Sequence, residues 1–137
     1  MDDQTIVFVQ GDVPAGFPSP ATDYLQKRID LNEYLVRNPL STFVIDCSGL
    51  SMINAFIAPK AKLVVDKSVN AQNGHIVLAV VNGEFTVKYL KKNKHKCWLV
   101  PANSKFSQIE ITPEMDFQVW GVVTKIINDP SENRCLL

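Results

Sequence analysis

Ser51 and Lys88 are the two residues of this sequence whose types and settings could support nucleophilic chemistry. Ser51 follows the turn-prone Ser48-Gly49 and precedes Met52-Ile53-Asn54, where a short helix could begin. In that position a serine either caps a backbone N–H group or presents its hydroxyl beside free N–H groups, which can stabilise an oxyanion. The local pattern alone favours the cap.

Lys88 is the candidate base, because a serine nucleophile needs one and no histidine is suitably placed. In the run Phe85–Leu90, the two-residue period of a strand puts Thr86, Lys88 and Leu90 on one face. If both faces of that strand are covered, burial lowers the pKa of Lys88 toward neutrality. If one face is open, Lys88 is simply the polar residue of an amphipathic strand. The periodicity leaves both interpretations open.

Other kinds of site find little support in the sequence. His75 and His95 are its only histidines, and neither has a second histidine or an acidic residue at metal-ligand spacing, so we expect no metal. No glycine-rich phosphate-binding motif occurs, so we expect no cofactor. A basic cluster surrounds Asn93, a turn residue, which favours a solvated hairpin tip over a phosphate-binding patch. The cluster comprises Lys91, Lys92, Lys94, His95 and Lys96.

The composition is that of one globular domain. The chain has 137 residues, with 14 basic and 14 acidic side chains and therefore no net charge. A neutral surface argues against broad nucleic-acid binding, which depends on counterion release, so we expect protein partners and no direct contact with nucleic acid. The apolar runs are too short for a signal peptide or a membrane span, and Cys47, Cys97 and Cys135 form no Cys-x-x-Cys motif. We therefore expect a cytoplasmic protein without disulfides.

The expected elements begin with an extended, turn-rich arm over residues 1–22, whose glycines and prolines prevent a regular helix. Apolar spacing over Asp23–Arg37 predicts one short helix or two broken turns. From Thr42 onward, β-branched and aromatic runs predict strands at residues 43–45, 62–65, 76–81, 85–90, 97–100 and 117–127.

Asn82-Gly83 predicts a tight hairpin that pairs Val77–Val81 with Glu84–Leu90, because both central residues of a type I′ turn need positive φ. Short strands at close spacing predict a mainly β fold, a compact domain of largely antiparallel strands.

Several motifs occur together in an order that is typical of one family. They are Ala15-Gly16-Phe17-Pro18-Ser19-Pro20-Ala21, Ser48-Gly49-Leu50-Ser51-Met52, Asn82-Gly83-Glu84-Phe85-Thr86-Val87-Lys88 and Trp120-Gly121-Val122-Val123, with Asp46 and Asp66 flanking the second motif. In these motifs the chain closely resembles the LexA-like, self-cleaving serine–lysine peptidases of the bacterial SOS response, and within them the UmuD branch. The resemblance runs from about Ala15 to Ile127.

The resemblance implies that Ser51 attacks the carbonyl of Ala15 and that Lys88 takes the hydroxyl proton and later gives it to the Gly16 amine. We expect three parts: an arm with the cleavage site (1–22), a peptidase-like β-domain (23–127), and a tail (128–137) that has no clear counterpart in the resembled family. The resemblance also implies a homodimer whose cleavage is promoted by the RecA filament on single-stranded DNA. The trimmed form would then join the Y-family polymerase UmuC in error-prone translesion synthesis, with no membrane involved.

The sequence departs from that family at two places near the candidate site. Leu50 stands where the family usually carries Asp, and Lys60-Ala61 stands where it carries Gly-Asp. An alternative therefore is a dimeric binding module without peptidase activity, in which Ser51 only caps a helix. A weaker alternative is a nucleic-acid-binding barrel that uses the lysine cluster, which the zero net charge disfavours.

Overall fold

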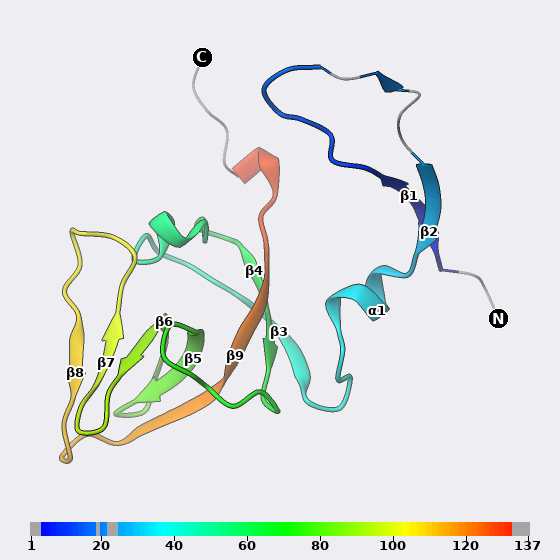
Figure 1. Ribbon diagram of the computed structural model, residues 1–137. Coiled ribbons are helices and arrows are strands. Elements are labelled where there is room, and N and C mark those ends of the chain that lie inside the picture. Colours follow the sequence, from blue (N-terminus) through cyan, green and yellow to red (C-terminus); the bar gives the residue numbers. More distant parts are fainter. Residues whose placement is uncertain (1–3, 19, 22–24, 133–137) are drawn as a thin grey trace. The chain divides into compact units, whose positions relative to one another are not determined.

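The computed structural model describes residues 4–18, 20–21 and 25–132, and it divides into two units, residues 1–37 and 38–137 (Figure 1). The end of the expected tail, including Cys135, lies outside the described residues. Within the described part, no helix is long and apolar enough to cross a membrane. The expected division into a cleavable arm, a peptidase-like domain and a tail is a functional division, and it stays a prediction.

The smaller unit holds a two-stranded antiparallel ribbon and one short helix. Strand β1 (Ile6–Gln10) pairs with β2 (Leu25–Ile29), and α1 (Leu31–Leu35) follows. The Asp30 carboxylate accepts the N–H groups of Asn32 and Glu33, so Asp30 starts the helix instead of interrupting one.

The extended arm and the single short helix are found in this unit, with two refinements. The arm contains a strand, and the helix expected over Asp23–Arg37 is confined to five residues after a strand. The physical reason is the pairing of β1 with β2, a contact between distant residues that helical spacing along the chain does not reveal.

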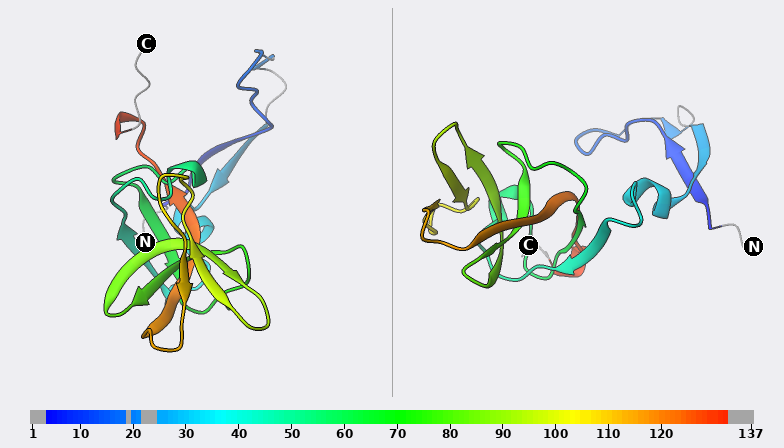
Figure 2. Two further views of the ribbon diagram at one scale, coloured as in Figure 1. Left: turned by 90° about the vertical axis from the view of Figure 1, so that its left-hand side faces the viewer. Right: turned by 90° about the horizontal axis from the view of Figure 1, so that it is seen from below.

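The larger unit is built on one seven-stranded antiparallel sheet in the order β3-β4-β9-β5-β6-β7-β8. Its strands are β3 (Thr42–Asp46), β4 (Lys62–Asp66), β5 (Ile76–Val81), β6 (Glu84–Lys92), β7 (Cys97–Val100), β8 (Ile109–Ile111) and β9 (Phe117–Ile127). Short 3₁₀ turns are η2 (Ile53–Ala55) and η3 (Pro130–Glu132). The mainly β prediction is confirmed, and Figure 2 shows how strongly this sheet twists. Only β8, a three-residue strand, lacks a counterpart among the strands expected for this unit.

The β5–β6 hairpin forms as the sequence predicts. Asn82 and Gly83 have φ values of 50° and 84°, and Val81 pairs with Glu84 across the turn. The resulting register sets Lys88 opposite Val77. The turn chemistry of two residues therefore decides where along the sheet the candidate base lies.

Both faces of β6 are covered around Lys88, although the two ends of the strand are exposed. Leu90 is 3% exposed and belongs to one core cluster with Val77, while Val87 and Tyr89 pack against a second cluster that contains Leu78. Because core clusters lie against both sides of the strand near Lys88, this side chain is half-buried. This observation decides between the two interpretations that the periodicity left open.

Asp66, on β4, is 4% exposed and is surrounded by hydrogen-bond donors. It accepts hydrogen bonds from Asn38 Nδ2 at 2.9 Å, from Ser41 Oγ at 2.7 Å, and from the backbone N–H and hydroxyl of Ser68 at 2.8 and 2.7 Å. These bonds, led by that of Asn38, hold the pKa of Asp66 well below its usual range. The network ties the first residues of the larger unit to β4, the second strand of its sheet.

We expect Asp66→Ala to lower the free energy of unfolding by about 2–4 kcal/mol at neutral pH, because the donors around it lose their acceptor. The native pKa lies below the unfolded value of about 3.9, so this stabilisation is present above that pH and is lost as the pH falls toward the native pKa. Urea unfolding at neutral pH and near pH 2, between the native and the unfolded pKa, measures both effects. Asp46→Ala is the control, since its exposed ion pair with Lys62 contributes about 0–1 kcal/mol. Equal losses in the two variants would contradict the prediction.

Candidate active site

The turn that carries Ser51 follows β3 and is fixed by backbone contacts from distant segments. The Ala102 N–H donates to the Ser51 carbonyl at 2.8 Å, and Asn103 Nδ2 donates to the Leu50 carbonyl at 2.9 Å. Gly49 has a φ of +86°, a conformation that other residues rarely adopt. The segment after β7 therefore holds the serine turn in place.

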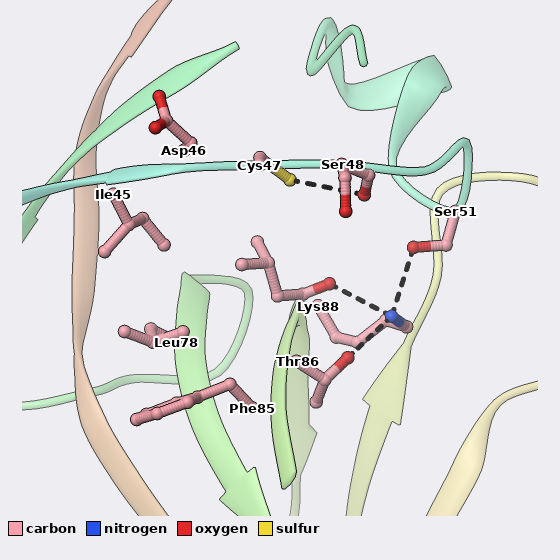
Figure 3. A pocket seen from close by; sticks show the side chains of 10 residues that line it. Ile45, Asp46, Cys47, Ser48, Ser51, Leu78, Phe85, Thr86 and Lys88 are labelled. Atoms are coloured by element: carbon pink, nitrogen blue, oxygen red, sulfur yellow. Dashed lines mark hydrogen bonds between the residues drawn. The ribbon is translucent and has the colours of Figure 1, made fainter. Parts of the chain in front are cut away.

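The Ser51 hydroxyl is directed toward Lys88 (Figure 3). Lys88 Nζ lies 3.1 Å from Ser51 Oγ and donates a hydrogen bond to it. The 3₁₀ turn that follows is capped at Met52 without a side-chain hydrogen bond, so the helix-cap interpretation of Ser51 is wrong. The sheet thus brings together two residues that are 37 positions apart in the sequence.

The environment of Lys88 favours its neutral form. Burial lowers the pKa of Lys88, and its interaction with Cys47 raises the pKa by a smaller amount. Burial also raises the pKa of the Cys47 thiol. A lysine that loses its proton more easily than usual can accept one from a serine hydroxyl.

Two further groups hold the Lys88 amine. Thr86 Oγ1 accepts a hydrogen bond from it at 2.8 Å, and the Val87 carbonyl accepts another at 3.2 Å. Sequence reasoning placed Thr86 on the same face of the strand as Lys88 but gave it no role. The two-residue spacing of Thr86 and Lys88 could have indicated this contact, because residues two apart on a strand share a face.

Ser51 and Lys88 line a pocket of about 280 Å³. Its other lining residues are Ile45, Asp46, Cys47, Ser48, Leu78, Phe85, Thr86 and Val87. Figure 3 shows the polar groups around Ser51 and Lys88 on one side and the apolar Ile45, Leu78 and Phe85 on the other. Such an arrangement can hold a short peptide while a serine and an amine act on it. Among the described residues, no group of three His, Cys, Asp or Glu side chains could hold a metal ion.

The other residues singled out in the sequence lie elsewhere. Ala15 and Gly16 lie in the connection between β1 and β2 and are exposed. The lysine cluster surrounds the turn between β6 and β7, where Asn93 Oδ1 accepts the N–H groups of His95 and Lys96. Every residue of the cluster is exposed, so the solvated hairpin tip is confirmed.

One departure from the resembled family has a clear geometric meaning. Lys60 has a φ of +70°, in the left-handed region that favours glycine, which is the residue the family usually carries there. Its neighbour Ala61 is 2% exposed, so a small apolar side chain occupies a buried position. The turn is formed by this sequence nonetheless, since Lys60 N–H donates to the Cys47 carbonyl at 2.8 Å.

Comparisons with known proteins found a matching family and several similar proteins. Residues 7–124 match the family described as Peptidase S24-like. Protein MucA of Salmonella typhimurium is 41% identical over 121 residues, which cover 88% of this chain and 82% of MucA. Protein SamA of Salmonella typhimurium (strain LT2) is 42% identical over 84% of this chain and 79% of SamA. The LexA repressor of Alcanivorax borkumensis is 32% identical over 90% of this chain but only 59% of the repressor.

Proposed function

The chain belongs to the Peptidase S24-like family, and from that premise we propose that it hydrolyses its own Ala15–Gly16 peptide bond. The observation that carries the proposal is the 3.1 Å contact between Lys88 Nζ and Ser51 Oγ in a pocket large enough for a peptide.

The reaction follows from the chemistry of the two side chains. Neutral Lys88 takes the hydroxyl proton as Ser51 Oγ bonds to the Ala15 carbonyl carbon, and the backbone N–H of Ser51 stabilises the oxyanion. The protonated amine then gives its proton to the Gly16 nitrogen, and the peptide bond breaks. Lys88 next takes a proton from water, whose oxygen attacks the acyl-enzyme, and Ser51 Oγ leaves and is reprotonated. The products are a new carboxylate at Ala15 and a new amine at Gly16.

The arm has the properties of a substrate. Ala15 is small and Gly16 has no side chain, so the peptide can enter a narrow pocket, and this connection is exposed. The prolines at 18 and 20 keep the following residues out of a helix or a central strand. Because enzyme and substrate are one chain, a high effective concentration compensates for a modest catalyst.

The same proposal covers the biological setting that the family resemblance implies. We place the protein in the SOS response, as a homodimer whose cleavage is stimulated by the RecA filament and whose trimmed form assists a Y-family polymerase of the UmuC kind. The similarity to MucA and SamA over most of both chains supports this branch. The LexA repressor extends well beyond the region that it shares with this chain.

Purified protein incubated at neutral pH and near pH 10 tests the activity, because the higher pH deprotonates a lysine base. Intact mass over time should show two fragments, one ending at Ala15 and one starting at Gly16, which form faster at high pH or when a RecA filament is added. A Ser51→Ala chain purified in the same way is the control, since a contaminating protease would still cut it. Absence of both fragments under all folded conditions would refute cleavage and leave the dimeric binding module.

Thr86→Val is expected to slow self-cleavage by about tenfold or more, because Lys88 Nζ loses an acceptor at 2.8 Å that orients it toward Ser51. Thr86→Ser keeps the acceptor oxygen and should remain within about threefold of wild type. A pH–rate profile separates positioning from general damage, since only loss of an interaction with the amine moves the midpoint of that profile. Equal rates for the valine and serine variants would show that the hydroxyl has no such role.

A further inference from the structure

Two aromatic side chains lie exposed next to the candidate active site. Phe85 on β6 is 59% exposed and Trp120 on β9 is 37% exposed. Their rings meet edge to face, with centroids 5.0 Å apart and an interplanar angle of 89°. Lys67 Nζ lies over the Trp120 ring, 4.9 Å from its centroid. Adjacent aromatic groups that stay partly exposed beside a pocket commonly mark a binding surface.

A break in strand pairing gives Trp120 its position. Leu78 on β5 pairs with Gly121 and Ala79 pairs with Val119, so Trp120 is the extra residue of β9 with no partner on β5. Bulges of this kind redirect a side chain and are frequent beside active sites. Gly121 lets the strand approach its neighbour closely, because a Cβ atom there would lie 2.6 Å from Val65 Cγ1. The backbone is therefore arranged to present the indole beside Phe85.

Phe85 and Trp120 border an apolar cavity of about 330 Å³, which we name the aromatic hollow. Its lining residues are Phe43, Ile45, Asp46, Leu78, Phe85 and Trp120. Four of these, Ile45, Asp46, Leu78 and Phe85, also line the pocket of Ser51 and Lys88. In Figure 3 Ile45, Leu78 and Phe85 lie on the side of that pocket away from Ser51, so the hollow extends the pocket beyond its apolar end.

We propose that the aromatic hollow binds the side chain of Phe17, the second residue after the bond that is cut, and so selects the register in which the arm enters the active site. The inference rests on the proposed self-cleavage. Phe17 is 85% exposed, so little of its ring is covered within the described residues. An extended chain advances about 3.3–3.6 Å per residue, so Phe17 lies about 7 Å beyond Ala15, within reach of a cavity that continues from the pocket.

The chemistry of the hollow favours Phe17 over the other apolar residue near the cleavage site. Val13 precedes Ala15 by two residues and is 71% exposed. An edge-to-face pair of rings offers an aromatic partner further favourable geometry, which an aliphatic side chain does not exploit. Val13 is therefore the residue against which the assignment of Phe17 is tested.

A double-mutant cycle on self-cleavage tests the proposal. Phe17→Ala and Trp120→Ala should each slow the appearance of the Gly16 fragment by about tenfold, and the double variant should be no slower than either single one. Phe8→Ala in the arm and Phe106→Ala in the larger unit, two exposed aromatic positions outside both cavities, should cleave at the wild-type rate. Independent, multiplying effects of Phe17→Ala and Trp120→Ala would overturn the proposal, as would coupling of Trp120 to Val13 in place of Phe17.

A second measurement does not depend on cleavage. In a Ser51→Ala, Trp98→Phe chain, Trp120 is the only tryptophan, because the sequence has two. Removing the Phe17 ring should shift its fluorescence emission to longer wavelength, whereas Val13→Ala should not. If the emission shifts in the Ser51→Ala chain while the wild-type chain, which keeps Ser51, shows no cleavage, docking is supported and self-cleavage is refuted. If the chain cleaves itself but Phe17 and Trp120 are not coupled and the Trp120 emission does not shift, the docking proposal is refuted and self-cleavage stands.

Discussion

Ser51→Ala is expected to abolish the fragment that starts at Gly16. Loss of the nucleophile removes the covalent route altogether, and serine peptidases deprived of it lose about three or more orders of magnitude in rate. The fold should persist, because Ser51 is only partly buried and its carbonyl still accepts the Ala102 N–H after the substitution. Intact mass after long incubation near pH 10 measures the effect at the pH where wild-type cleavage is fastest.

Ser104→Ala is the matched control for that experiment. Ser104 is exposed in the segment after β7 and lines neither the pocket of Ser51 nor the aromatic hollow. It should cleave at the wild-type rate. If the Ser51→Ala chain yields the Gly16 fragment as fast as the Ser104→Ala chain, another nucleophile or a contaminant cuts the arm.

Lys88→Ala and Lys88→Arg are expected to lose cleavage almost as completely as Ser51→Ala. The reason is that the reaction needs a neutral amine within reach of Ser51 Oγ, and alanine supplies none. Arginine keeps a positive charge but holds its proton at every accessible pH, so it separates the role of base from that of charge. We expect rates reduced by about a thousandfold in both variants.

The pH dependence of the wild-type chain follows from the direction of the Lys88 shift. Because burial lowers the pKa of Lys88, the neutral amine becomes abundant at a lower pH than for a free lysine. The cleavage rate should therefore rise with pH, with a midpoint below about 10.4, the pKa of a free lysine. A series of quenched time points between neutral pH and pH about 11 locates the midpoint.

Lys105→Arg serves as the control, since Lys105 is exposed and lines neither cavity. Its pH profile should coincide with that of the wild type. If the Lys88→Arg chain cleaves with an unchanged pH–rate profile, the reaction requires a positive charge at this position and does not use a lysine base.

Local chemistry made much of the larger unit predictable. The Asn82-Gly83 turn determined a hairpin register because its backbone geometry admits few residues, and β-branched runs determined most strands. The ribbon of the smaller unit was not predictable, because the pairing of β1 with β2 depends on residues that are remote along the chain. Strand β8 was not predictable for a different reason, since three residues are too few to show an alternating pattern.

Within the candidate site, the sequence by itself determined which residues could act and on which strand face Lys88 lies, because a strand repeats every two residues. Only the tertiary structure decided that both faces of that strand are covered, that the Ser51 hydroxyl meets Lys88 and caps no helix, and that Thr86 holds the amine. Burial and hydrogen-bond partners come from segments far apart in the sequence, and the pKa of an amine depends on that enclosure more than on its neighbours along the chain.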